Sequence, residues 1–300
     1  MVIFGKEQRI VWLHVAIIIA VVLVAYSRIF AAGFMSWDDI DYVFNTPDIT
    51  HFNGEHFNNW WTEFYIGNYQ PLPMMSYALD YLMGGNQPFV YHLTSITWHI
   101  LDALLVYASI RRMQGDIYIA LFVALLFALH PVQTESVSWI AARNKVMNGF
   151  FFLMAMYIYI GYALENSNKK LILIYLFAIA AYLCKLTAVT LPFALLAIDI
   201  WMHRPLTGKR IWLEKLPLVL LAIPIGIINL QAQADVSFLN LHPEYHFGHT
   251  ILFAGYAYVQ YIINLLVPVK LSVLYPYPTT IGAVHIFYTI IAIAIMVTGV

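Results

Sequence analysis

Charged residues are scarce in this 300-residue sequence. It has 15 Lys and Arg and 16 Asp and Glu, together 10% of the chain, whereas a typical globular protein has about 25%. Apolar residues make up 62% and aromatic residues 16%. So few charges cannot cover the surface of a water-soluble protein of this length, which excludes a soluble fold. The sequence predicts an all-α polytopic membrane protein whose main solvent is lipid.

Several motifs of soluble enzymes are also absent. The one cysteine, Cys184, excludes an internal disulfide and lies in an apolar run, which favours inert packing. The sequence has no glycine-rich phosphate loop, no CxxC pair, no Gly-x-Ser-x-Gly elbow and no dinucleotide-binding fingerprint. The net charge of -1 gives no reason to expect a nucleic-acid partner.

Long apolar runs are what the sequence has instead, and a membrane-spanning helix needs about 20 such residues. About nine segments qualify or nearly do: Ile10–Ala31, Phe89–Ile110, Ile117–Leu129, Val146–Leu164, Leu171–Cys184, Ala188–Met202, Ile211–Leu230, Ile251–Val267 and Val284–Val300. We expect one transmembrane catalytic domain over residues 1–300, with outer loops at about 32–88 and 231–250. Because the last run has no polar flank, we expect the natural chain to continue beyond residue 300.

The positions of Lys and Arg predict the orientation, because cytoplasmic loops carry an excess of these residues. Lys6 and Arg9 precede the first segment and place the N-terminus in the cytoplasm. Three further turns between the apolar segments also carry Lys or Arg, and their order along the chain places each of them on the cytoplasmic side. Their basic residues are Arg111, Arg112, Lys169, Lys170, Arg204, Lys209 and Arg210. Between Arg28 and Arg111 there is no Lys or Arg, and the part of this stretch at about 32–88 contains seven acids. We therefore expect the loop at about 32–88 on the outer face.

Aromatic residues are frequent in this first outer loop. The segments Phe52–Tyr65 and Pro71–Leu82 are amphipathic candidates for short helices in the headgroup layer of the membrane. The alternative is a loop that packs on the helix bundle without entering that layer.

Asp38 and Asp39 form an acid pair just outside the first apolar segment. Two adjacent carboxylates in a cleft can divide the work of a group transfer: one accepts a proton from a hydroxyl, and its neighbour positions it or binds a divalent cation. The alternative is a solvated acidic turn.

A second polar stretch, His130–Trp139, follows the third segment on the outer side. If Thr134–Met147 is one helix, then Glu135, Trp139 and Arg143 share a face. An acid and a guanidinium on one stripe at the membrane surface suit a phosphate or a polar head group. The alternative is a structural Glu135–Arg143 pair that seals a helix end.

Lys185 lies between two apolar runs on the expected outer side, against the positive-inside trend. It needs an anionic partner, which a lipid phosphate or one of the outer acids can supply; the alternative is a lysine whose ammonium extends to the water layer.

Histidines give weaker signals. His92 and His99 flank the outer half of the second segment; His92 is a candidate for the cleft, whereas His99 suits a hydrogen-bonded core position. His242, Glu244, His246 and His249 have spacings that would suit zinc on a helix, but Pro243 and Gly248 oppose a helix there. We therefore expect no metal site in this loop.

Several motifs together resemble a known family, over roughly Trp37–Pro205. They are Asp38–Asp39, Asn68–Leu72, Tyr91–Leu93, His130–Arg143 with its HPxxxE pattern, Cys184–Pro192 and Asp199–Trp201. In this combination the sequence is similar to the membrane portion of the transmembrane-and-tetratricopeptide-repeat (TMTC-type) O-mannosyltransferases, particularly their bacterial branch. These proteins belong to the GT-C superfamily of polytopic glycosyltransferases.

The resemblance implies transfer of a mannose-like sugar, with inversion, from a polyprenyl-phosphate donor to a hydroxyl acceptor such as protein Ser or Thr. The reaction is expected on the outer face of the membrane, in bacteria the inner (cytoplasmic) membrane. By position, Asp38 is the expected general base and Asp39 the next candidate. His130, Glu135 and His92 would shape the substrate site, and Arg143 and Lys185 would hold the donor phosphate.

Two other classes of function fit a helical bundle with few charges. A transporter or lipid-sugar flippase would place ionisable residues near the bilayer midplane and often has two related halves. A binding scaffold without activity would keep the lipid-linked sugar site and lose turnover. In this sequence the charges collect at the expected outer interface and there is no internal repeat, which favours the enzyme over a transporter, whereas only activity separates the enzyme from a scaffold.

Overall fold

The computed structural model describes residues 2–165, 167–236, 246–269, 271–272, 274–275 and 282–298, without the side chains of residues 2–6 and 168. In these residues the regular elements are helices; the β-type contact is an isolated bridge between Tyr65 and Asn68. The contacts divide the chain into two units, Met1–Val236 and Ser237–Val300. Whether both act as one catalytic domain stays a prediction.

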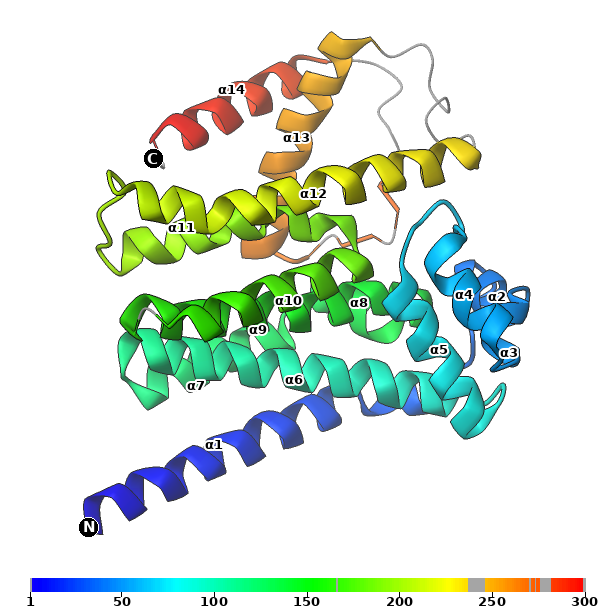
Figure 1. The fold of residues 1–300 in the computed structure, drawn as a ribbon, viewed down its shortest axis with the longest axis horizontal. Coiled ribbons are helices and arrows are strands. Elements are labelled where there is room, and N and C mark those ends of the chain that lie inside the picture. Colours follow the sequence, from blue (N-terminus) through cyan, green and yellow to red (C-terminus); the bar gives the residue numbers. More distant parts are fainter. Residues whose placement is uncertain are drawn as a thin grey trace. The chain divides into compact units, whose positions relative to one another are not determined.

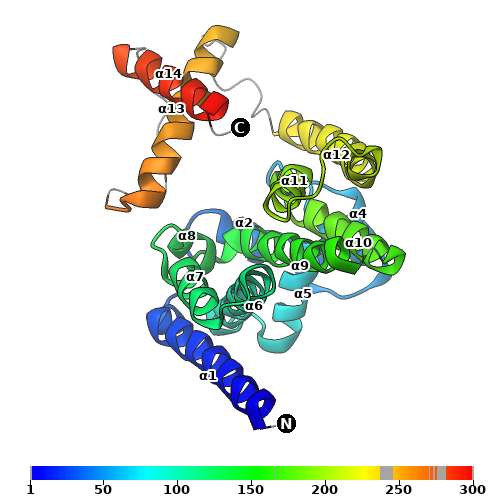
Figure 2. The ribbon, with the colours of Figure 1, turned by 90° about the vertical axis from the view of Figure 1, so that its left-hand side faces the viewer.

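The first unit is built on long apolar helices. They are α1 (Val2–Ala25), α6 (Pro88–Gln114), α7 (Ile117–Leu129), α9 (Arg143–Glu165), α10 (Asn168–Cys184), α11 (Leu191–Trp201) and α12 (Lys209–Asp235). These helices run side by side across Figure 1, and Figure 2 shows them nearly end-on, with α1 beside α6 and α7. Each contains most of a predicted apolar segment, so the helical prediction is confirmed for these segments.

Local sequence signals explain where these helices begin and end. Pro88 opens α6. The first N–H groups of a helix have no acceptor within the helix, so the N–H that proline lacks costs no hydrogen bond there. Gly115 ends the helix with φ 77°, a left-handed conformation that favours glycine. Asp116 then caps α7 by accepting from the N–H groups of Tyr118 and Ile119 at 2.7 and 3.0 Å.

Four helices are long and apolar enough to cross a membrane: Glu7–Ala25, Pro88–Gln114, Ile140–Glu165 and Lys209–Asp235. That count applies to the part of the chain that the structure describes. The expected bundle of about nine spanning helices of GT-C type therefore stays a prediction, although all nine segments contain helices.

The segment predicted to be the first outer loop folds into short helices that pack on the bundle. They are η1 (Ser27–Ala31), α2 (Asp38–Val43), α3 (Pro47–Thr50), α4 (Gly54–Thr62) and α5 (Pro71–Gly84). Trp60 and Tyr77 are buried in a core that includes Ile140 and Ala141, whereas Phe57 is exposed. The two predicted helices in this loop are thus present as α4 and α5; their position in the headgroup layer stays a prediction.

Two further cores hold the long helices together. One joins α1, α6 and α7 with α8 (Gln133–Ser138). The other joins α9, α10, α11 and α12 with η3 (Leu186–Thr190). The helices α2–α5 gather at one end of this bundle, and the α9–α10 and α11–α12 connections lie at the opposite end (Figure 1). The outer acids and the basic turns are therefore at opposite ends of the first unit.

The second unit contains α13 (Phe247–Leu266) and α14 (Ala283–Thr298), which pack on each other. A Cβ atom at Gly255 would lie 2.5 Å from the Thr289 hydroxyl oxygen, so glycine permits this close approach. The Thr289 hydroxyl lies 3.2 Å from the Leu252 carbonyl and 2.7 Å from the His285 carbonyl.

Candidate functional site

Asp39 is buried and fixes the acid pair to the bundle. Its Oδ1 accepts from the Ala141 N–H at 2.7 Å and its Oδ2 from the Met35 N–H at 2.9 Å, with 1% of the residue exposed. Burial raises the pKa of Asp39, while these two N–H groups act against the rise. Both carboxylate oxygens are thus engaged in positioning α2 against the segment before α9.

Asp38 differs from its neighbour, because its carboxylate is only partly buried. It makes no hydrogen bond or ion pair with any residue that the structure describes. Burial raises the pKa of Asp38, and the negative charge of Asp41 raises it further. Of the two carboxylates, Asp38 is the one whose oxygens can accept a proton without breaking an existing bond.

The stretch after His130 is not one helix, so the prediction of a continuous helix over Thr134–Met147 is wrong. The α8 helix ends at Ser138, Trp139 is extended (φ -86°, ψ 119°), and a short turn η2 (Ile140–Ala142) precedes α9. The cause is tertiary: the Ala141 N–H donates to Asp39, and the Ile140 carbonyl accepts from the Tyr77 hydroxyl at 2.7 Å. These bonds replace helical ones.

The break changes the partner of Glu135. Glu135 pairs with Lys145, so the structural Glu135–Arg143 pair is also wrong. Lys185 is close enough to both for their charges to act on it: its pKa is lowered to about 8, first by burial and then by Lys145, with Glu135 opposing. Glu135, Lys145 and Lys185 therefore gather in one place, with two positive charges and one negative.

Arg143, two residues before Lys145 in the chain, is fully buried. Its guanidinium pairs with Asp80 and donates to Ser76 Oγ at 3.1 Å and to the Tyr91 carbonyl at 2.8 Å. It also lies over the Tyr77 ring, 4.6 Å from the centroid. A direct contact between Arg143 and a donor phosphate does not fit this enclosed position. Arg143 instead connects the start of α9 to α5 and α6.

A pocket of about 370 Å³ opens beside Lys185. It is lined by Asn68, Tyr69, Gln70, Asn144, Cys184, Lys185, Leu186, Thr187, Val189, Asn229 and Gln233. Asn144 Nδ2 donates to Gln70 Oε1 at 2.8 Å, whereas the buried atoms Asn144 Oδ1 and Gln70 Nε2 have no hydrogen-bond partner among the described residues. An unpaired acceptor and donor at a pocket wall are what a polar ligand would satisfy.

Tyr42, on the same helix as the acid pair, contacts a residue of this pocket. Asn68, which lines the pocket, donates to the Tyr42 hydroxyl at 3.4 Å. Burial raises the pKa of Tyr42, and the nearby Asp38 charge raises it further, so the phenol stays neutral beside Asp38. The Tyr42 hydroxyl is thus joined by a hydrogen bond to the pocket wall, and the charge of Asp38 acts on the same phenol.

The predicted histidines take other positions. His130 is partly buried at the end of α7, where its Nδ1 accepts from the Val132 N–H at 3.2 Å. His92 is buried in α6, 2% exposed. Neither residue lines the pocket, and their roles stay predictions. His99 donates from Nε2 to the Ala128 carbonyl at 3.0 Å and packs on Phe127, which confirms the core position.

In the part of the chain that the structure describes, no three His, Cys, Asp or Glu residues stand close enough to hold a metal ion. His242 and Glu244 lie outside the described residues. His246 and His249 are described, with stacked rings 5.7 Å apart.

Sequence reasoning missed most of the amide side chains of the pocket. Asn229 and Gln233 lie near the end of α12, and Asn148 donates to the carbonyls of Ala181 and Lys185 at 2.9 and 3.1 Å. Amides inside apolar helices are a usable signal, because lipid leaves them no water to bind.

The chain is similar to protein O-mannosyltransferases of the TMTC type. It is 35% identical over 124 residues to "Protein O-mannosyl-transferase Tmtc1" of Drosophila melanogaster, covering 41% of this chain and 14% of that protein. It is 28% identical over 163 residues to TMTC3 of Mus musculus (52% and 18%) and 32% identical over 158 residues to tmtc2 of Xenopus laevis (48% and 19%). In each case the match covers less than a fifth of the relative.

No family model matches the chain, and no solved structure matches it. The similarity to the TMTC-type proteins and the apolar helices together support a membrane protein related to them.

Proposed function

We propose that this chain carries the catalytic membrane part of a glycosyltransferase of GT-C type. It moves a mannose-like hexose from a polyprenyl-phosphate donor to a hydroxyl acceptor, such as protein Ser or Thr, on the outer face of a bacterial inner membrane. The similarity to protein O-mannosyltransferases supports the type of transfer. The observation that carries the proposal is one pocket lined by Lys185 and by unpaired amide atoms, with Tyr42, on the helix of the acid pair, bonded to its wall.

In this proposal the donor phosphate binds at Lys185. The Lys185 carbonyl is held by Asn148, so its position is fixed, and Lys145 adds a second positive charge nearby. Glu135 holds Lys145 in place by their ion pair. A phosphate brought between the two ammonium groups relieves their mutual repulsion, which is why the site favours an anion.

The sugar occupies the pocket, where its hydroxyl groups would satisfy Asn144 Oδ1 and Gln70 Nε2. Arg143 acts here as a positioning residue. By pairing with Asp80 it holds the first turn of α9, and so the adjacent Asn144 and Lys145, against α5 and α6. His130 and His92 are proposed only to support the walls of the cleft.

Transfer then needs one base and one stabilised leaving group. Asp38 accepts the proton of the acceptor hydroxyl as its oxygen attacks the anomeric carbon. The bond from that carbon to the phosphate oxygen breaks, and the phosphate leaves with the electron pair. Lys185 neutralises the developing charge. Attack opposite the leaving group inverts the anomeric configuration. Asp39 holds α2 in place, and this route requires no divalent cation at the acid pair.

The test uses the full-length protein in lipid vesicles with radiolabelled polyprenyl-phosphate mannose and a Ser/Thr peptide. We expect label on the peptide with inverted configuration, and about 10- to 100-fold less with Lys185→Gln, because a charged hydrogen bond contributes about 1.5–3 kcal/mol. Lys169→Gln, an exposed lysine at the opposite end, is the matched control. Donor that binds without bond cleavage would indicate a scaffold, and intact donor that crosses the vesicle would indicate a flippase.

A further inference from the structure

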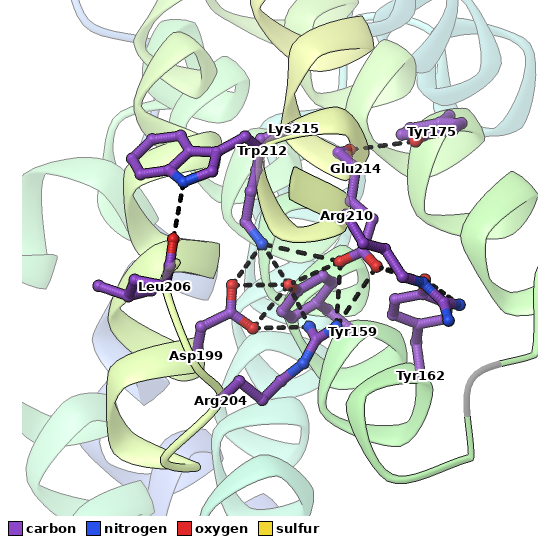
Figure 3. Close-up of polar contacts among 10 residues, drawn as sticks. All are labelled: Tyr159, Tyr162, Tyr175, Asp199, Arg204, Leu206, Arg210, Trp212, Glu214 and Lys215. Atoms are coloured by element: carbon purple, nitrogen blue, oxygen red, sulfur yellow. Dashed lines mark hydrogen bonds and ion pairs between the residues drawn. The ribbon is translucent and has the colours of Figure 1, made fainter. Parts of the chain in front are cut away.

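A second polar cluster lies at the end of the first unit opposite the pocket, between α9, α11 and α12. Tyr159 on α9 donates to Asp199 on α11 at 2.8 Å, and Lys215 on α12 pairs with the same carboxylate (Figure 3). Arg204 bridges Asp199 at 2.7 Å and Glu214 at 3.3 Å. Asp199 and Lys215 are 0% and 3% exposed, so the inner part of the cluster is removed from solvent.

The cluster has more positive than negative charge. Its bases are Arg204, Arg210 and Lys215, and its acids are Asp199 and Glu214. The inner charges pair with each other, whereas the Arg210 side chain is 58% exposed. The excess positive charge is therefore on the outside, at Arg210.

Arg210 is held in one orientation by the cluster. Its Nε donates to Glu214 at 3.1 Å, and its Nη2 donates to the Tyr162 hydroxyl at 3.0 Å. A guanidinium has five N–H donors, so three remain without a partner among the described residues. Glu214 already accepts from Tyr162, Arg204 and Arg210, so its charge is compensated. A fixed guanidinium with free N–H groups matches the geometry of a phosphate.

Arg210 faces a pocket of about 440 Å³, lined also by Tyr162, Leu171, Tyr175, Leu213 and Glu214. The pocket lining combines polar groups, at Arg210 and Glu214, with the apolar side chains of Leu171 and Leu213. Beyond it, apolar side chains of α10 and α12 are exposed, among them Ile172 (60%), Leu176 (56%) and Leu220 (56%). Trp212, on the other side of α12 (Figure 3), is exposed and donates to the Leu206 carbonyl at 2.9 Å; an exposed tryptophan of this kind is typical of a membrane boundary.

We propose that this pocket binds the phosphate group of an anionic phospholipid. The free N–H groups of Arg210 contact the phosphate oxygens, and the acyl chains lie along the exposed apolar faces of α10 and α12. Basic pockets between membrane helices bind anionic head groups in this way. The exposed apolar residues favour a lipid over a free phosphate ion. This site uses none of the residues proposed for sugar transfer, so it stands or falls independently.

The test is native mass spectrometry of the full chain, released from mixed micelles with equal phosphatidylglycerol and phosphatidylcholine. Both lipids have a phosphate, but the choline head group cancels its charge. We expect wild type to retain phosphatidylglycerol preferentially, and Arg210→Gln to lower that preference about 10-fold. Lys209→Gln removes the same charge from the neighbouring residue, which does not line the pocket, and should leave the preference unchanged.

Two further measurements separate the alternatives. Arg210→Lys keeps the positive charge but loses the planar, paired N–H donors of the guanidinium. It should therefore retain part of the preference for phosphatidylglycerol over phosphatidylcholine that Arg210→Gln loses. Inorganic phosphate in large excess should not displace the lipid. Equal retention of both lipids, equal effects of Arg210→Gln and Lys209→Gln, or displacement by inorganic phosphate would each overturn the proposal. Unchanged thermal unfolding of Arg210→Gln shows that the effect is local. If that variant unfolds, Arg210→Lys alone tests the proposal: its preference for phosphatidylglycerol should be lower than that of wild type, and an unchanged preference would overturn the proposal.

Discussion

Arg143 and Asp80 form an ion pair in which both side chains are removed from solvent, with exposures of 0% and 1%. Asp80 is held in turn by the Thr94 hydroxyl at 2.6 Å. The pair joins α5 to the first turn of α9, the turn that carries Asn144 and Lys145. It therefore connects the fold of the outer loop to the geometry of the pocket.

Breaking this pair should destabilise the protein strongly. Arg143→Leu leaves Asp80 as an unpaired buried carboxylate, which costs about 3–5 kcal/mol. The double variant Arg143→Leu/Asp80→Leu should recover much of this loss, because no charge then remains buried. Unfolding of the detergent-solubilised protein by heat measures both. Arg111→Leu is the control, since its exposed pair with Glu7 at 3.6 Å contributes about 0–1 kcal/mol. Equal effects of Arg143→Leu and Arg111→Leu would contradict this account.

Asp48 should make the outer loop sensitive to acid. Burial alone would raise its pKa, but hydrogen bonds from His56, Asn59 and Tyr65 lower it below the ordinary value. A lowered folded-state pKa contributes stability that is present above the ordinary pKa and lost as pH falls through the folded one. Hydrogen exchange of the loop should therefore accelerate at low pH.

Asp48→Asn should remove this pH dependence and increase exchange at neutral pH. The exposed Glu55 on α4 provides a matched control as Glu55→Gln. If the two variants exchange alike at every pH, Asp48 does not organise the loop.

The pH profile of sugar transfer should have a falling limb set by Lys185. Because its pKa is lowered to about 8, the ammonium is lost above that pH, and kcat/KM should fall there. Lys185→Arg should move the fall to higher pH, because arginine stays protonated. The rising limb should lie above the ordinary pKa of an aspartate, since the pKa of Asp38 is raised. A falling limb that stays in place in Lys185→Arg would assign it to another group.

The unpaired amide atoms of the pocket should contribute to donor binding. Asn144→Ala removes the free Oδ1 and the hydrogen bond to Gln70, and should raise the donor Kd about 10-fold. Asn45→Ala removes an exposed amide on the same side of the fold, bonded only to Asp41 among the described residues, and should not change it. Titration with a fluorescent polyprenyl-phosphate sugar measures both. An unchanged Kd in Asn144→Ala would place the sugar elsewhere.

The helices were predictable from sequence because apolar runs and capping residues such as Asp116 are local signals. The segments 117–129 and 171–184 nearly match α7 and α10. The break at Trp139 was not predictable, because two distant residues, Asp39 and Tyr77, bind the backbone there.

The same reason explains the partners in the site. Helical spacing predicted that Glu135 would lie beside Arg143. Because the helix is interrupted at Trp139, Glu135 pairs with Lys145 instead. The positions of the charges along the chain indicated that Arg143 and Lys185 were exceptions to the charge pattern. Nothing local indicated that Asp80 would pair with Arg143. Long-range pairing of this kind depends on how helices pack, which a single sequence does not specify.

The central claim is that Asp38 is the base of a sugar transfer, and one variant tests it most directly. Asp38→Asn keeps the size of the side chain and removes the proton acceptor; Asp41→Asn removes the neighbouring exposed acid of α2. Turnover of polyprenyl-phosphate mannose should fall about 10²- to 10⁴-fold in Asp38→Asn, with donor binding retained. It should stay within a few-fold of wild type in Asp41→Asn. Wild-type turnover in Asp38→Asn would contradict the account.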